Sequence, residues 1–212
     1  MKNLMDVRIE EARTYYVQTK QTLYMLFGSL WAQVVQKEEF EATHSRQKAD
    51  IAFLEDHGDE LRGAAHETLI RQRAKLLATE GGIKASVLAI NILAGTVLQI
   101  AKQAISIRHG ADISDCALQG RLISGTCVRD LIWIGRNQAM HFEETNETKQ
   151  PGIRKSGWVD LFKILNTHHQ GAFSLAPPFQ SKAFEILQIL GWSRFDQYES
   201  DMQDLGVAPS HE

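Results

Sequence analysis

The sequence predicts an all-α protein, and three observations carry this prediction. Apolar residues recur at helical spacing over most of the 212 residues. The chain contains only 4 Pro, and no alternating run of apolar and polar residues marks a strand. With 43% hydrophobic and 23% charged residues, the composition is typical of a folded helical protein and unlike that of a disordered chain. We therefore expect an antiparallel helical bundle with extended N-terminal helices and short C-terminal helices.

The first 80 residues predict long, charge-rich helices. Residues 4–36 follow one apolar face and form a helix longer than a compact bundle needs, long enough to pair with a second copy. Residues 37–80 are also helical, and we expect a break at residues 57–59, where Gly58 precedes a capping Asp59. Gly81 and Gly82 form the clearest break in the first half. We expect one domain over 1–212, with 1–80 as a helical N-terminal extension and the motif core at about 83–145.

Residues 83–108 are apolar on nearly every side, which is typical of a helix at the centre of a bundle. The segment 85–101 has no charged residue, so it has to be weighed as a membrane span. It is short for a span and contains four polar side chains, and we therefore favour a buried core helix and no membrane contact. The short connection at residues 109–112 predicts an antiparallel hairpin between this helix and the next.

The stretch from Leu118 to Thr145 predicts one helix of about six to seven turns, capped by Asp115. At about 100° per residue, Asn137 and His141 stack on one another, whereas Arg136 and His141 diverge by about 140°. Buried polar groups are costly unless they are paired, so this set is either satisfied internally or functional. Imidazole can move a proton from a hydroxyl, and guanidinium binds phosphate oxygens. The set suits cleavage of RNA by its own 2′-hydroxyl, without a metal or another cofactor.

The segment from Arg136 to His141 resembles the Arg-x4–6-His signature of the HEPN superfamily of helical ribonucleases and toxins, in the form with Asn directly after Arg. The resemblance covers the motif helix and its neighbours. It implies a metal-independent endoribonuclease, a toxin or defence effector, with Arg136, His141 and Asn137 as catalytic residues. It also implies a homodimer with motif helices at the interface, so that two copies of each residue share one cleft. A nucleotidyltransferase-like antitoxin is the further partner that the resemblance suggests.

Four other basic residues are candidates for RNA contact. Arg129 is a candidate second phosphate clamp, and pairing with Asp130 or with a surface acid is an alternative of at least equal weight. Lys149, Arg154 and Lys155 lie in a polar loop after the motif, which is either an ordinary connection or an RNA-contacting flap. The main alternative to catalysis is a dimeric helical module that binds a protein or a nucleotide. In that case Arg136 and His141 are expected to be locked in salt bridges.

The remaining features limit the partners and the compartment. A net charge of -3 argues against a dedicated nucleic-acid coat, although basic groups can still converge in one cleft. Cys116 and Cys127 predict free thiols, and the N-terminus does not resemble a signal peptide, so we expect a cytoplasmic protein. His168 and His169 lack companions at ligand spacing, and we expect no metal site. Three short helices are predicted at 158–169, 180–190 and 194–205.

Overall fold

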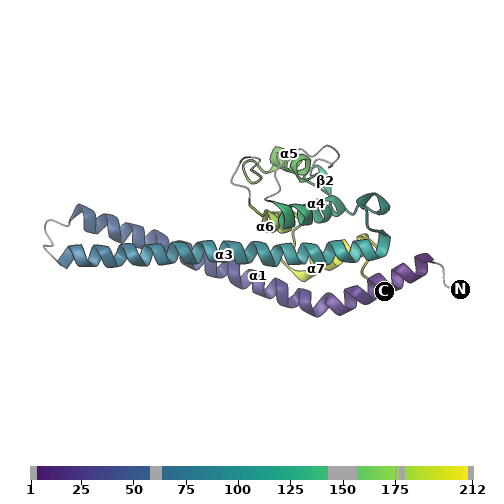
Figure 1. Ribbon diagram of the computed structural model, residues 1–212, viewed down its shortest axis with the longest axis horizontal. Helices are drawn as coiled ribbons and strands as arrows, with labels where there is room; N and C mark the ends of the chain where they lie inside the picture. Colours follow the sequence, from purple (N-terminus) through teal and green to yellow (C-terminus); the bar gives the residue numbers. More distant parts are fainter. Residues whose placement is uncertain (1–3, 58–63, 143–156, 175, 177–179, 210–212) are drawn as a thin grey trace. The chain divides into compact units, whose positions relative to one another are not determined.

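The computed structural model describes residues 4–57, 64–142, 157–174, 176 and 180–209. In these residues the protein is an all-α helical bundle, as predicted. The helices are α1 (Leu4–Asp56), α3 (Ala64–His109), α4 (Val128–His141), α5 (Trp158–His168), α6 (Ala183–Ile189) and α7 (Phe195–Asp204), labelled in Figure 1. A single 3-10 turn, Ile113–Asp115, and two short strands, β1 (Leu122–Ile123) and β2 (Thr126–Cys127), lie between α3 and α4.

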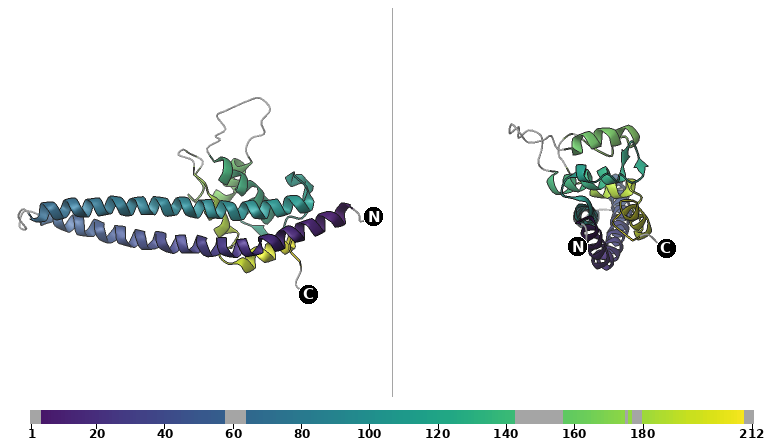
Figure 2. Two further views of the ribbon diagram at one scale, coloured as in Figure 1. Left: turned by 60° about the horizontal axis from the view of Figure 1, so that its bottom comes forward. Right: turned by 90° about the vertical axis from the view of Figure 1, so that its right-hand side faces the viewer.

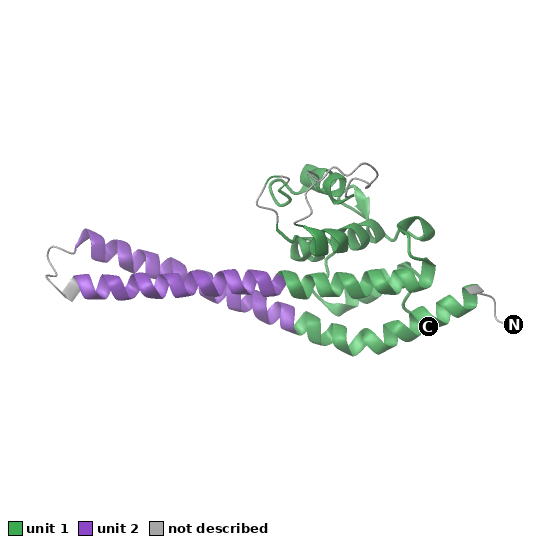
Figure 3. Cartoon of the chain, viewed as in Figure 1, with its two compact units in different colours: residues 1–28, 91–212 green, residues 29–90 purple. Residues whose placement is uncertain are grey.

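The chain forms two compact units, coloured separately in Figure 3. Unit 2 comprises residues 29–90, and unit 1 comprises residues 1–28 together with 91–212. The first seven turns of α1 belong to unit 1, where the Tyr16 hydroxyl donates to Glu199 and the Phe27 ring contacts Phe195 and Tyr198 of α7.

Unit 2 is an antiparallel pair of helices, built from the end of α1 and the first part of α3. Glu55 accepts from Arg73 at 2.6 Å near one end, and His44 lies 3.2 Å from Glu80 nearer the other. Between the helices, Gly82 lies against the ring of Phe40, where a Cβ would come within 2.9 Å of the ring. Glycine at position 82 therefore permits the close approach of the two helices.

Two predicted helix breaks in this region are wrong. Residues 36 and 37 lie inside α1, which continues to Asp56, and Gly81 and Gly82 lie inside α3. A glycine in a helix costs only about 1 kcal/mol relative to alanine, and packing against α1 offsets this cost at Gly82. The break predicted at residues 57–59 agrees with the end of α1, although residues 58 and 59 lie outside the described residues.

In unit 1, the C-terminal half of α3 and helix α4 run antiparallel, as predicted; Figure 1 labels the two helices next to each other, and Figure 2 gives two further views. The pairing is visible in the register. A Cβ on Gly95 would lie 3.5 Å from that of Ala139, and further along α3 Lys102 lies over Trp133. Residue numbers therefore rise along α3 in the direction in which they fall along α4, as in an antiparallel pair.

The motif helix begins ten residues later than the sequence predicts. Residues 122–127 form a hairpin whose two-residue turn places Ser124 at φ 49° and Gly125 at φ 79°. Two consecutive left-handed residues are the requirement of the tight hairpin turn, and the Ser-Gly pair meets it. Cys127 then has an extended backbone at the N-cap, and α4 starts at Val128. At its other end α4 stops at His141, and the predicted extension to Thr145 falls largely outside the described residues.

The C-terminal helices lie within three residues of their predicted bounds. Trp192 and Phe195 are buried at the junction of α6 and α7, where both rings contact Tyr198. Val207 and Ala208, beyond the end of α7, also belong to the core. Both are buried, and their backbone N–H groups donate to the carbonyl of Met202 at 2.9 and 3.1 Å.

Helix α3 is less enclosed than its sequence predicts. One helical stretch of the described chain, within His66–His109, is long and apolar enough to cross a membrane, but only about a third of its most apolar window is buried. The side chains of Leu88 and Ile92 are 63% and 60% exposed. An apolar helix of this composition was expected to be surrounded on every side, and it instead leaves one side open.

Candidate anion-binding site on helices α3 and α4

Small residues hold the motif helix close to its neighbours. A Cβ on Gly135 would come within 2.7 Å of the Ile186 side chain of α6, so a larger residue here would require the Ile186 side chain to move. On the opposite contact, Ala139 faces Gly95 of α3. These contacts position the last two turns of α4, which contain Arg136, Asn137 and His141.

Arg136 is held by amide oxygens. Its Nε donates to Oε1 of Gln99 on α3, and its Nη1 donates to Oδ1 of Asn137 at 3.2 Å. Arg136 forms no ion pair with any residue that the structure describes. Both partners orient the guanidinium without neutralising its positive charge. A half-buried cation in this state is suited to bind an anion through its remaining donors.

A second cation stands beside the first. Lys102, one turn along α3 from Gln99, places Nζ 4.6 Å from the centroid of the Trp133 ring. Burial lowers the pKa of Lys102, and the positive charge of Arg136 lowers it further. The positive charges of Lys102 and Arg136 repel each other, and neither forms an ion pair with a carboxylate that the structure describes. A bound anion would relieve this repulsion.

Asn137 and His141 take different positions. Asn137 is half-buried and accepts from Arg136, so in this structure it orients the arginine. His141 is the last residue of α4, and its side chain is exposed. Arg136 and His141 are five positions apart on the helix, which corresponds to about 7.5 Å of axial rise and the predicted divergence of about 140°.

Arg129 is occupied within the fold. Its Nε donates to Asp130 at 2.8 Å and its Nη1 donates to the carbonyl of Cys116 at 2.6 Å. Its side chain is only 16% exposed. Arg129 therefore pairs with Asp130, the alternative to RNA contact. The structure does not bring its guanidinium together with Arg136 and Lys102. Lys149, Arg154 and Lys155, the three predicted RNA contacts of the loop, lie outside the described residues.

Three residues around the site were missed by the sequence reasoning. Gln99 and Lys102 lie on α3, and only the register of the hairpin could have placed them opposite Arg136 and Trp133. Gln138 is 1% exposed, and its amide donates to the carbonyl of Gln180 and accepts from the backbone of Lys182. This amide ties the chain entering α6 to α4. The polar side chain of Gln138 within the motif was the available signal.

A buried carboxylate forms a separate cluster elsewhere in unit 1. Asp201 on α7 is 1% exposed and accepts from Arg121 at 2.7 and 3.0 Å and from Trp192 Nε1 at 2.7 Å. Arg121 also donates to the carbonyl of Leu190 at 2.5 Å. These bonds connect the segment before the hairpin to α6 and α7. The carboxylate is fully engaged by donors of the fold, so we assign it a structural role.

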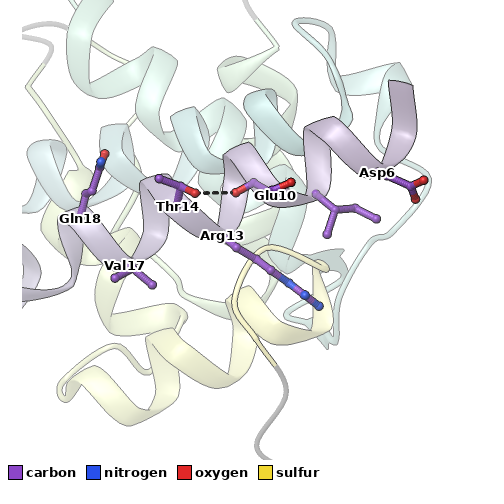
Figure 4. A pocket seen from close by; sticks show the side chains of 7 residues that line it. Asp6, Glu10, Arg13, Thr14, Val17 and Gln18 are labelled. Carbon is purple, nitrogen blue, oxygen red and sulfur yellow. Dashed lines mark hydrogen bonds between the residues drawn. The ribbon is translucent and has the colours of Figure 1, made fainter. Parts of the chain in front are cut away.

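The hollow shown in Figure 4 offers no comparable chemistry. Its lining comes from α1 alone, and the Thr14 hydroxyl there donates to the Glu10 backbone carbonyl at 2.8 Å. Among the described residues, no group of three or more His, Cys, Asp or Glu side chains is placed to hold a metal ion. Cys116 and Cys127 are free thiols, as expected, and burial raises the pKa of both.

No protein-family model, curated protein or solved structure matches this chain.

Proposed function

We propose that the protein is a metal-independent endoribonuclease of the HEPN type. The observation that carries the proposal is the state of Arg136. Its guanidinium is oriented by two amide oxygens, lies beside Lys102 and has no carboxylate partner in the described part of the chain. A purely structural arginine at this position would be expected in a salt bridge. An oriented and uncompensated guanidinium fits a phosphodiester instead.

In the proposed reaction, His141 accepts the proton of the 2′-hydroxyl as that oxygen attacks the adjacent phosphorus. The bond from phosphorus to the 2′-oxygen forms, and the bond from phosphorus to the 5′-oxygen breaks. Arg136 stabilises the additional negative charge on phosphorus, a contribution typically worth about 10²–10³ in rate. The leaving 5′-oxygen takes a proton from water or from His141 of the partner subunit. The products are a 2′,3′-cyclic phosphate and a 5′-hydroxyl.

A homodimer belongs to this proposal. Arg136 and His141 point in directions about 140° apart on one helix, so a single α4 presents them poorly to one phosphate. Two copies with their α4 helices at a two-fold axis supply two of each residue to one cleft. We place this composite site, like the activity, in the cytoplasm, where free cysteines such as Cys116 and Cys127 persist.

The test is RNA cleavage by the purified full chain in excess EDTA. We expect fragments ending in a 2′,3′-cyclic phosphate by mass spectrometry, and no cleavage of an oligonucleotide with 2′-deoxy sugars. His141→Ala should abolish cleavage, whereas His66→Ala, at an exposed histidine of unit 2, should not. Cleavage of the deoxy substrate, or cleavage that requires magnesium, would refute the mechanism. Binding of RNA without any cleavage would favour the non-catalytic module.

A further inference from the structure

Helix α3 carries an exposed stripe without charge in unit 2. The stripe consists of Ala74, Leu77, Gly81, Ala85 and Leu88, all of which are exposed. Leu77 and Leu88 expose 69% and 63% of their surface. At about 100° per residue the five positions fall within about 80° of one another. The residues of α3 that are buried in this unit, Thr79, Ser86 and Ile90, lie on the opposite side, toward α1.

The order of residues in the stripe points to its occupant. Leu77 lies four residues before Gly81 and Ala85 lies four residues after it. Ala74 lies seven residues before Gly81 and Leu88 lies seven residues after it. Each leucine thus has an alanine at the same distance on the other side, and eleven residues from Gly81 on either side stand the exposed Ile70 and Ile92. If two copies pair antiparallel about Gly81, every leucine meets an alanine of the other copy. A parallel pair would place leucine against leucine and leave gaps at the alanines.

Gly81 itself suits the point of closest approach. Among the described residues, a Cβ at this position would meet nothing within 4 Å, so no contact that the structure describes requires glycine here. At the crossing of two helices, a missing side chain on both lets the backbones approach closely. Gly81 therefore has a use between copies that it lacks within one copy.

The charges beside the stripe agree with the same register. Lys84 and Glu80 lie along one edge, about 60° and 100° from Gly81. In the antiparallel arrangement Lys84 faces position 78 of the other helix, about 3 Å of axial rise from Glu80 of the second copy. Opposite charges therefore come within reach on this edge, where Glu80 also lies 3.2 Å from His44 of its own chain, and the two-fold symmetry repeats the arrangement.

We propose that α3 pairs antiparallel with α3 of a second copy of this chain, with a two-fold axis through Gly81. Exposed apolar surface of this kind commonly marks an interface. The proposal does not depend on ribonuclease activity, because no residue of the stripe belongs to the Arg136 site. A chain that also forms the composite active site would assemble beyond a dimer, since it would use two different two-fold contacts.

Cysteine cross-linking of the full chain tests this register, because a disulfide needs Cα atoms within about 7 Å. Under mild oxidation Gly81→Cys should form linked dimers by itself. Leu88→Cys should not, because its two copies lie about 21 Å apart along the axis. A mixture of Leu88→Cys with Ala74→Cys should link. The unmodified chain, whose two cysteines are buried, is the control, and circular dichroism verifies that each variant folds.

Three results would overturn the proposal. The first is self-linking of every single variant, which would indicate parallel pairing. The second is no linking by Gly81→Cys together with an unchanged mass in solution for Leu77→Glu/Leu88→Glu. The third is binding of the unmodified chain to phosphatidylcholine–phosphatidylglycerol vesicles that Leu77→Glu/Leu88→Glu abolishes, without linking by Gly81→Cys. That result would assign the stripe to a lipid surface.

Discussion

The Nε of Arg136 donates to the amide oxygen of Gln99, a residue that lies 37 positions earlier in the chain. This bond joins α4 to α3 and fixes the direction of the guanidinium without neutralising its charge. The amide oxygen of Asn137, the next residue of α4, also accepts from Arg136 and helps to orient the guanidinium. The amide pair lets the protein keep a cation oriented before any anion arrives, which reduces the ordering cost of binding.

Arg136 and His141 should fail in different ways when they are replaced. Arg136→Ala removes both phosphate attraction and charge stabilisation, so we expect RNA binding to weaken and cleavage to fall about 10²–10³-fold. His141→Ala should abolish cleavage and spare binding, because the imidazole moves a proton. Fluorescence anisotropy with labelled RNA, read alongside cleavage rates, separates the two effects. Arg194→Ala, at an exposed arginine of the same unit, is the control for lost positive charge. Equal loss of binding in both site variants would contradict the assigned roles.

Lys102 should contribute to anion binding in a pH-dependent way. Burial and Arg136 lower the pKa of Lys102, so the free protein loses this proton at lower pH than an ordinary lysine does. Sulfate affinity should therefore decline as pH rises through that lowered pKa, because the anion binds the protonated form. Lys102→Gln should bind sulfate about tenfold more weakly and show no such decline, as expected for loss of one charged hydrogen bond. Calorimetry from pH 7 to 10 measures both, with Lys163→Gln as control. A pH-independent affinity in the unmodified chain would contradict the prediction.

Asp201 should be important for stability. Its buried carboxylate receives Arg121 and Trp192, and Asp201→Asn leaves the guanidinium without its charge partner. Because Arg121 is partly exposed, we expect a loss of about 3 kcal/mol in the free energy of unfolding, at the lower end for broken buried pairs. Urea denaturation followed by circular dichroism measures it. Asp204→Asn, an exposed carboxylate on the same helix, should change stability by less than about 0.5 kcal/mol.

Replacing Tyr198 with phenylalanine should stabilise the protein. Its hydroxyl is buried and has no hydrogen-bond partner in the described part of the chain. An unsatisfied buried donor costs about 1–3 kcal/mol, so Tyr198→Phe should raise the free energy of unfolding by about 1 kcal/mol. Tyr16→Phe is the matched opposite, because the Tyr16 hydroxyl donates to Glu199 at 2.5 Å. That variant should lose stability in the same thermal or urea unfolding experiment. A destabilised Tyr198→Phe would show that the hydroxyl has a partner.

The sequence by itself determined the helical class, the C-terminal helices and the antiparallel hairpin that carries the motif. These follow from the spacing of apolar residues along one chain segment, which is a local property. Position on a helical wheel also placed Asn137 beside Arg136 and His141. The local pattern gave a wrong prediction at Gly82, because a glycine can either end a helix or allow close packing within one. Gly82 reads as a helix stop, but it lies inside α3 because Phe40 occupies the space of its missing side chain.

Only the tertiary structure decided which side chains from other helices join the motif. Periodicity predicts that α3 and α4 are neighbours, but their register depends on which small residues interlock, here Gly95 with Ala139. That register brings Gln99 to Arg136 and Lys102 to Trp133. It also decided that Arg129 is used within the fold, since the hairpin carries the Cys116 carbonyl to it. Register is a property of two packed surfaces, and one segment's sequence does not contain it.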